Sequence, residues 1–356
     1  MEKKTHIPLL DIFRIFICGM VFLFHAVVHK FWVIEQDGFF YPNIATGALY
    51  MDAFFILSGF LLYYLYSDKL QNFSIQTVKD FYLKRVKRIY PHYILSTIVI
   101  SVLAGIVWWA IPVEVFCLQG FFPSLFNKMG NGGTWFISCL MVCYLLFPFL
   151  TDLIKQIKKE VLVIILLYFT MIYFNCLVID LKIKWIALYI HPIYRILEFV
   201  IGMFVGKLFC TKPSLDSVKA SIVSIIGFVL LFGLVPVLYK CNFINHVKFA
   251  QNYPLYCVLT VPIFSVLIYS LASVKNKFVD IIAQNKLIKL ISALTFPFFI
   301  WQGIAQILTR IVVKNYSLGE YSFMLYFVIT LFLSTILYIM IDVGLKYFTR
   351  IFKKEG

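Results

Sequence analysis

The sequence is short of charged residues. Only 14% of its 356 residues are Asp, Glu, Lys or Arg, whereas 62% are hydrophobic, and the mean hydropathy is +0.90. Soluble globular domains carry about 25% charged and about 45–50% apolar residues. A water-soluble core cannot hide so many apolar side chains, because its size is limited by surface-to-volume scaling. The composition therefore excludes an ordinary soluble domain and favours a chain that resides in lipid.

Other absences narrow the class further. The eight cysteines contain no CxxC pair, and no His or acidic residue lies near Cys139 and Cys143 in sequence to complete a metal set. We therefore expect no metal, and cysteines that act as small apolar residues. Internal repeats, low-complexity tracts and a cleavable signal peptide are also lacking, since the first apolar stretch carries Arg14 and His25 and no cleavage site follows it. We expect one transmembrane domain over residues 1–356, with no soluble appendage.

What the sequence does have is a series of long apolar segments. One crossing of the bilayer needs about 20 mostly apolar residues. The segments should be helices, because backbone polar groups in hydrocarbon must be satisfied internally. The sequence thus predicts an all-α polytopic membrane protein with about ten transmembrane helices. The ten segments are 9–28, 44–66, 91–111, 134–152, 161–179, 186–209, 219–239, 254–274, 290–309 and 321–345.

The basic residues are distributed unevenly between the two ends of these segments. The end that includes the N terminus carries 22 Lys and Arg residues, the opposite end carries 8, and Arg14 and Arg195 lie inside spans. Lys and Arg accumulate on the cytoplasmic side of membrane proteins, so we expect both termini in the cytoplasm. The net charge of +15 would then face anionic lipid headgroups. No alternation of basic and aromatic residues suggests a nucleic-acid groove, so we expect membrane lipid and no nucleic acid as a partner.

Five ionisable residues lie within predicted spans. Such groups cost on the order of 2.5–3.5 kcal/mol each on insertion scales and usually mark function. Arg14 and His25 are eleven residues apart, roughly three turns, and so share a face of the first span. Asp52 is expected at a depth comparable to that of His25, where a carboxylate would fix the tautomer of the imidazole and raise its basicity, as in acyl-transfer triads. From spacing alone, the alternative is a structural hydrogen-bonded pair inside a helix bundle.

Two other charged features each allow two interpretations. Arg195 and Glu198 are spaced i,i+3 in the sixth span, as in a structural ion pair or a pair that orients a substrate. Residues 81–91, in the loop expected between the second and third spans, form the densest basic patch. Such a patch is usually an anchor of topology. The alternative is a phosphate site, because Arg binds phosphate oxygens in a bidentate manner.

Six segments, in order along nearly the whole chain, resemble the motifs of one family. They are Arg14 and His25 with ten residues between them, Asp52–Leu61, Arg85–Tyr93, Thr134–Ser138, Pro192–Met203 and Ser292–Trp301. Together they resemble the bacterial acyltransferase type 3 family of membrane O-acyltransferases. Many members carry two acidic or amide residues after the tryptophan at Trp135, and a His at the position of Gln302. The Gln side chain keeps a hydrogen-bond donor and a hydrogen-bond acceptor but cannot shuttle protons at neutral pH. The identity of the molecule that receives the acyl group therefore stays open.

This resemblance implies transfer of an acyl group, most often acetyl from acetyl-CoA, to a carbohydrate hydroxyl. Arg85 and Arg88 would bind the phosphates of the acyl-CoA donor at the cytoplasmic face, and Arg14, counted with His25 and Asp52 as catalytic, would hold the donor's inner end or its thioester region. His25 would be the general base or would carry the acyl group itself, and Asp52 would orient it. The residues expected to line the cavity and bind substrate are Ser58, Trp135, Ser138, Arg195 and Glu198.

The implied partners are a glycan or lipid-linked sugar acceptor and polysaccharide-assembly proteins, in the plasma membrane of a bacterium. The sequence leaves open the identity of the glycan, acetyl against succinyl, and the oligomeric state. The alternative from another class is a transporter or export component for a polysaccharide, but transporters tend to show two related halves, which this sequence lacks. A purely structural membrane subunit is the third interpretation, and the five ionisable groups in spans argue against it.

Overall fold

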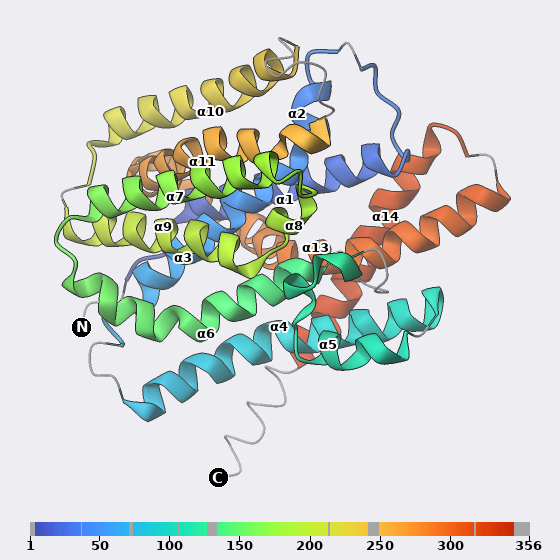
Figure 1. Cartoon of the computed structure of the whole chain (residues 1–356), viewed down its shortest axis with the longest axis horizontal. Helices are drawn as coiled ribbons and strands as arrows, with labels where there is room; N and C mark the ends of the chain where they lie inside the picture. Colours follow the sequence, from blue (N-terminus) through green and yellow to red (C-terminus); the bar gives the residue numbers. More distant parts are fainter. Residues whose placement is uncertain are drawn as a thin grey trace.

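The computed structural model describes residues 4–36, 38–70, 74–105, 107–126, 134–212, 214–240, 249–316 and 318–344. Over these ranges the chain consists of helices and connecting turns, without β-strands, which confirms the all-α prediction (Figure 1). The long helices are α1 Pro8–Val28, α3 Tyr50–Tyr66, α4 Ile75–Ala104, α6 Trp135–Gln156, α7 Glu160–Asp180, α9 Pro192–Thr211, α10 Ser217–Lys240, α11 Phe249–Ser273, α13 Lys286–Asn315 and α14 Tyr321–Leu337.

Short elements connect the long ones. The α-helical ones are α2 Tyr41–Ala45, α5 Ile111–Val115, α8 Ile186–Tyr189 and α12 Lys277–Gln284. The 3₁₀ turns are Gly47–Leu49, Trp108–Ala110, Gln119–Phe121 and Pro123–Leu125, and a π-helical turn, Tyr338–Val343, continues α14.

Each predicted apolar segment falls on one of the long helices, so the polytopic architecture is confirmed. By length and composition, eight described helices are apolar enough to cross a membrane, namely α1, α3 with its preceding turn, α6, α7, α10, α11, α13 and α14. The other two long helices, α4 and α9, carry more charge. In α9 the charges are Arg195, Glu198 and Lys207, all three of them buried.

The structure corrects the third predicted segment. Helix α4 begins at Ile75 and ends at Ala104, so the basic residues 81–91 lie on a helix and not in a loop. Ser74 caps the first turn by accepting a hydrogen bond from the backbone N–H of Thr77 at 3.1 Å. Lys and Arg are good helix formers, so the basic run continues the helix. Gly105, at φ 97°, ends it.

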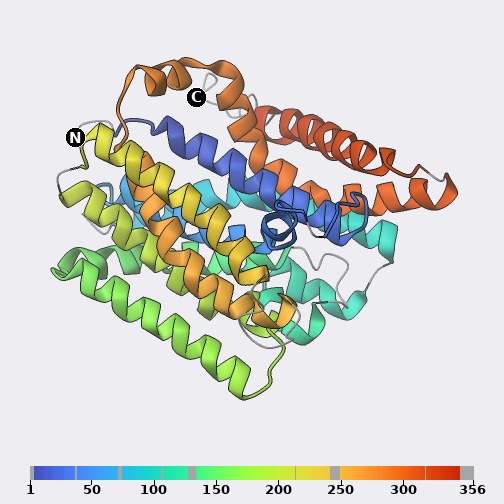
Figure 2. The same cartoon turned by 90° about the horizontal axis from the view of Figure 1, so that it is seen from above.

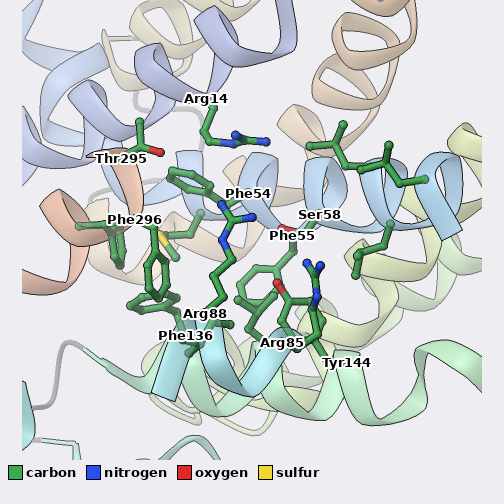
Figure 3. A pocket seen from close by; sticks show the side chains of 17 residues that line it. Arg14, Phe54, Phe55, Ser58, Arg85, Arg88, Phe136, Tyr144, Thr295 and Phe296 are labelled. Atoms are coloured by element: carbon green, nitrogen blue, oxygen red, sulfur yellow. The ribbon is translucent and has the colours of Figure 1, made fainter. Parts of the chain in front are cut away.

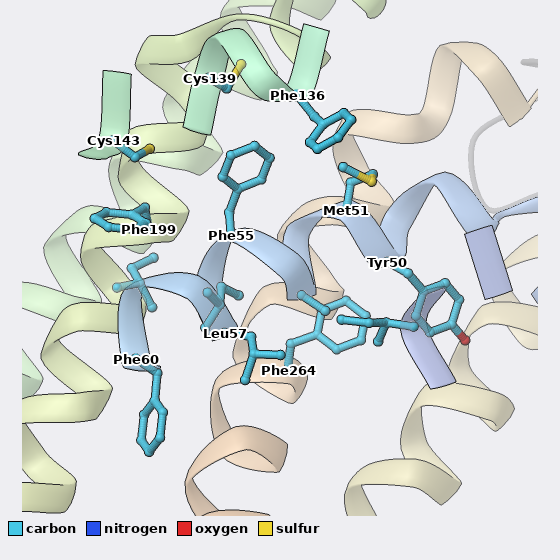
Figure 4. Packing of buried hydrophobic residues seen from close by; sticks show 14 of the residues in the cluster. Tyr50, Met51, Phe55, Leu57, Phe60, Phe136, Cys139, Cys143, Phe199 and Phe264 are labelled. Carbon is cyan, nitrogen blue, oxygen red and sulfur yellow. The ribbon is translucent and has the colours of Figure 1, made fainter. Parts of the chain in front are cut away.

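Helices α3 and α9 cross at very short range near the centre of the molecule. A Cβ atom on Gly59 would lie 2.0 Å from the carbonyl oxygen of Phe199, and one on Gly202 would lie 2.0 Å from that of Ile56. Only glycine fits at either position, as at close helix crossings in membranes. Figure 4 shows the packing around this crossing, with Phe55 and Phe199 among the labelled rings. The crossing fixes the position of α3, which carries several predicted site residues.

The outer faces of the bundle are apolar. Large exposed hydrophobic side chains are found on α7, α10 and α14, including Phe169, Val229 and Phe332. Soluble monomers rarely expose contiguous apolar patches larger than a few hundred Å². The connections α6–α7 and α9–α10 lie at the end of the molecule where α1 begins, at the left of Figure 1. This arrangement suits helices that cross the lipid back and forth.

Candidate active site

A cavity of about 180 Å³ lies between α1, α3, α4, α6 and α13 (Figure 3). Its polar lining comes from three arginines, two hydroxyl side chains and a tyrosine, and no carboxylate belongs to the described residues that line it. Four of the predicted site residues therefore meet here from three distant helices. The polar lining residues are Arg14, Ser58, Arg85, Arg88, Tyr144 and Thr295.

The two arginines of α4 are one turn apart and both reach the cavity. Arg85 donates from Nη2 to the hydroxyl of Tyr66 at 2.8 Å, and its guanidinium lies 5.2 Å from the centre of the Tyr66 ring and 5.6 Å from that of Phe81. Its Nε is buried and has no hydrogen-bond partner. The side chain of Arg88 is exposed toward the cavity. Among the described residues, no carboxylate lies within ion-pair distance of Arg85 or Arg88, which leaves both guanidiniums able to bind an anion.

Arg14 approaches from α1 on the other side of the cavity. Its Nη1 lies 3.3 Å from Asp11 Oδ1 and 3.3 Å from Ser292 Oγ, and Ser292 donates to Asp11 at 2.8 Å. These contacts join the beginning of α1 to α13. Three guanidiniums thus converge where one carboxylate, that of Asp11, partly compensates them. Such an excess of positive charge suits a polyanion such as a phosphate group.

The cavity also has an aromatic wall. The rings of Phe136 and Phe299 are 4.3 Å apart, edge to face, and those of Phe54 and Phe299 are 5.8 Å apart. Arginines and aromatic rings in one cavity suit an amphipathic ligand, with an anionic group and a less polar extension. Among the described residues, no group of three His, Cys, Asp or Glu side chains comes together to hold a metal ion.

The structure corrects the pairing predicted for Asp52. Its Oδ1 lies 2.5 Å from Nη1 of Arg195, which also contacts Glu198 Oε1 at 2.6 Å, and all three side chains are fully buried. Nδ1 of His25, by contrast, is buried and has no hydrogen-bond partner. The i,i+3 ion pair therefore forms and recruits Asp52, so that Asp52 orients Arg195 and not the imidazole.

The reason for this difference is the level at which α3 begins. The chain before α3 is divided into α2 and a 3₁₀ turn, and α3 starts only at Tyr50. Gly47 packs against Phe24 of α1, and Tyr50 packs edge to face on Phe16 with ring centres 5.5 Å apart. These contacts show that α3 runs antiparallel to α1. Asp52 therefore lies nearer the beginning of α1 than His25 does. The predicted depths assumed that the second span begins at residue 44.

The expected lining of the cavity is also corrected in part. Of the five predicted substrate residues, Ser58 lines the cavity, whereas the other four lie behind its wall. The ring of Trp135 lies 5.3 Å from the Arg195 guanidinium, and Ser138 Oγ accepts from the backbone N–H of Gly120 at 3.2 Å. Phe55 lines the cavity on one side and lies 5.5 Å from the Arg195 guanidinium on the other. Trp135, Ser138, Arg195 and Glu198 thus support the wall and do not form its surface.

His25 lies near the opposite end of α1 from Arg14. Its ring stacks on that of His29, with the ring centres 5.8 Å apart. Burial and the nearby Arg310 guanidinium lower the pKa of His29, which follows the last residue of α1, to about 4. His29 is therefore neutral at pH 7, and its Nδ1 can accept a hydrogen bond from Arg310. His25 retains an unpaired nitrogen beside this neutral ring.

Several contacts of this region carried no signal in the sequence. Tyr144 and Thr295 become part of the cavity only because α6 and α13 reach α4 and α1. His92, which follows the basic run, is fully buried, and its Nε2 lies 2.7 Å from Oδ2 of Asp342 on the π-helical turn. Trp301 Nε1 donates to His92 Nδ1 at 3.4 Å. These contacts tie α4 to α13 and α14, and only the tertiary structure reveals them.

Comparison with known proteins shows the family of the chain. A family model described as "Acyltransferase domain" matches residues 7–343. The chain belongs to this acyltransferase family. It is the type 3 family that the six motifs of the sequence indicated.

Two curated proteins resemble this family member over part of their length. An acyltransferase of Streptomyces mycarofaciens, named MdmB, is 26% identical over 235 residues, which is 59% of this chain and 59% of the relative. An uncharacterized protein of Haemophilus influenzae (strain ATCC 51907 / DSM 11121 / KW20 / Rd) is 26% identical over 143 residues, which is 34% of this chain and 58% of the relative. The chain therefore spans less than two thirds of either relative. No solved structure matches it.

Proposed function

We propose that this membrane acyltransferase moves an acetyl group from acetyl-CoA to a hydroxyl of a cell-surface or lipid-linked glycan, in the plasma membrane of a bacterium. The observation that carries the proposal is the cavity with Arg14, Arg85 and Arg88 on its lining and no carboxylate among its described lining residues. Acyl-CoA is a polyphosphate with a less polar arm. The charges and the aromatic wall of the cavity are complementary to those two parts.

The donor would enter from the end of the bundle where α1 begins. Arg85 and Arg88 would hold its phosphates through charge-assisted hydrogen bonds. Arg14 would contact the donor from α1. The distribution of Lys and Arg predicts both termini in the cytoplasm, where acyl-CoA is found. This orientation is part of the proposal.

His25 would act on the acceptor, as the general base for its hydroxyl or as a transient carrier of the acyl group. It lies eleven residues beyond Arg14 on α1, a rise of about 16 Å. The acyl group, still bound to the donor as its thioester, would therefore have to reach along α1 toward the outer leaflet, where a growing or lipid-linked glycan and polysaccharide-assembly proteins would meet the enzyme. The thioester C–S bond would break there as the acyl carbon bonds to the acceptor oxygen, directly or through the His25 nitrogen, and the CoA thiol would leave with the proton of the hydroxyl. The relative named an acyltransferase supports group transfer over transport. Three of the five ionisable residues expected in spans also pair with one another, in the Asp52–Arg195–Glu198 cluster.

The donor site can be tested with a pair of matched double variants. Arg85→Gln/Arg88→Gln removes two cavity charges, whereas Lys84→Gln/Lys87→Gln removes two exposed charges of the same helix that do not line the cavity. Hydrogen bonds to charged groups contribute about 1.5–3 kcal/mol each, so the arginine variant should raise the KM for acetyl-CoA by at least about tenfold. The lysine variant should leave it within about twofold. Equal effects of the two variants would show that the basic residues 81–91 serve only to anchor the topology of the protein in the membrane.

The acceptor side is tested with the purified protein, radiolabelled acetyl-CoA and the host's surface glycan, from which acetyl groups have first been removed with mild base. His25→Ala should abolish transfer to the glycan while donor binding persists, because His25 does not line the donor cavity. Retained transfer by this variant would remove His25 from the mechanism.

A further inference from the structure

The amide of Gln302 is buried without a protein partner. The residue is 2% exposed, and neither Nε2 nor Oε1 has a hydrogen-bond partner. A buried polar group that is left unpaired destabilises the fold. The next turn of α13 shows the ordinary arrangement, since the amide of Gln306 donates to the hydroxyl of Tyr326 at 3.3 Å. An amide with both ends unpaired is therefore a candidate for binding something other than the protein.

The packing of α1 on α13 places Gln302 level with His25. The two helices lie side by side (Figure 2), and residue numbers rise together along both, so they run parallel. His25 is one turn beyond Phe22, and Gln302 is one turn beyond Phe298. Further along, the guanidinium of Arg310, about two turns beyond Gln302, contacts His29, which is one turn beyond His25. The contacts that fix this register are Arg14–Ser292, Cys18–Thr295 and Phe22–Phe298.

The unpaired atoms at this level have complementary chemistry. The amide offers a donor at Nε2 and an acceptor at Oε1, and the imidazole of His25 offers Nδ1, also buried and unpaired. A single hydroxyl that receives the Nε2–H bond at its oxygen can direct its own O–H to the imidazole. The Oε1 atom is then free to accept from a second hydroxyl. Two neighbouring hydroxyls, as on a sugar ring, satisfy all three atoms.

We propose that Gln302 is a positioning residue that holds the acceptor glycan by two neighbouring hydroxyls and directs one of them to His25. This inference rests on the function proposed above. It goes further in assigning an acceptor subsite to the seam between α1 and α13, and in requiring a pair of adjacent hydroxyls. An acceptor with a single hydroxyl leaves Oε1 unpaired, and sites built to hydrogen-bond a group discriminate strongly against analogues that lack it.

The test compares Gln302→Met with Gln306→Met, two changes of similar volume on neighbouring turns of α13. Gln302→Met should raise the KM for the deacetylated glycan by about tenfold or more, because one to two hydrogen bonds are lost. It should leave the KM for acetyl-CoA unchanged. The melting temperature without substrate should not fall, since the replaced amide has no protein partner. Gln306→Met should lower the melting temperature, because it loses the bond to Tyr326, and should leave the acceptor KM unchanged.

The outcomes separate this inference from the proposed function. If the wild-type protein transfers no acetyl to the glycan, the proposed function fails. If it transfers acetyl and Gln302→Met keeps the wild-type acceptor KM, then the amide holds only water and the inference is overturned while the function stands. A lower melting temperature for Gln302→Met, with an unchanged acceptor KM, would also overturn it by showing a structural role.

Discussion

The three charges of Asp52, Arg195 and Glu198 illustrate how a charged motif can serve structure. The guanidinium of Arg195 bridges both carboxylates, donates from Nε to the backbone carbonyl of Tyr189 at 2.7 Å, and lies 4.6 Å from the centre of that residue's ring. Burying charges is costly unless they are paired and hydrogen-bonded. The cluster joins α3 to α9 behind Phe55, which lines the proposed donor cavity.

Removing the cation from this cluster should be severe. Arg195→Met leaves two carboxylates buried without their cation, and breaking a buried pair costs about 3–5 kcal/mol. We expect a correspondingly lower free energy of unfolding, measured by thermal or denaturant unfolding in detergent. Lys219→Met, at an exposed position, should change stability by less than about 0.5 kcal/mol. Equal stability of the two variants would contradict the structural role of the cluster.

Residue identity predicted in part which side chains come together, while their roles stay predictions. Arg14, Ser58, Arg85 and Arg88 were selected from the sequence, and the structure brings them to one cavity. Asp52 was assigned to the wrong partner because a charge inside a span shows only that a partner must exist. Which partner it takes depends on the level at which two helices cross, and periodicity within one helix carries no such information.

At the scale of elements, the crossing of α3 and α9 positions the site. Gly59 and Gly202 let the two backbones approach until a Cβ atom would meet a carbonyl oxygen. This proximity brings Asp52 to Arg195 and turns Ser58 toward the cavity. The sequence motifs that contain these glycines therefore specify, in large part, how α3 packs on α9.

Substitution of these glycines should separate close packing from helix propensity. Gly59→Ala places a methyl group 2.0 Å from the carbonyl oxygen of Phe199, which the backbones must move to accommodate. Overpacking typically costs about 1–3 kcal/mol and sometimes more, and we expect at least the upper end of this range. Gly19→Ala and Gly233→Ala meet nothing within 4 Å and should be neutral or stabilising by up to about 1 kcal/mol. The free energy of unfolding of the three variants in detergent measures these effects. A Gly59→Ala variant as stable as the wild type would refute the close crossing of α3 and α9.

The extent of α4 shows what hydropathy misses at this scale. The apolar stretch alone predicted a span over 91–111, whereas the helix covers Ile75–Ala104. Hydropathy reports where lipid can surround a helix. It does not report helix formation, which the capping Ser74 and the Lys and Arg residues also favour. As a result, Arg85 and Arg88 are held one turn apart on a rigid helix, a spacing that a loop would not fix.

At the scale of the whole molecule, α1 and α13 form a seam with polar groups at successive levels. Arg14 and Ser292 meet at the end next to the donor cavity, His25 and Gln302 lie further along, and His29 meets Arg310 beyond them. Several of the remaining long helices, among them α7, α10 and α14, present apolar faces outward. The long apolar helices could be predicted from composition and length, although eight of the described helices, against about ten expected, are apolar enough to cross a membrane. The parallel pairing of the first helix with one that begins at Lys286 could not, because it joins segments nearly the whole chain apart.

We propose that donor and acceptor act from opposite ends of this seam. The most direct measurement uses sealed proteoliposomes in which the N terminus faces one known side, with radiolabelled acetyl-CoA supplied on one side and deacetylated glycan on the other. We expect labelled glycan only when acetyl-CoA is on the side of the N terminus, because the cavity is lined by Arg14, near the beginning of α1, and by Arg85, which contacts Tyr66 at the end of α3. Equal labelling with acetyl-CoA supplied from the opposite side would contradict the account.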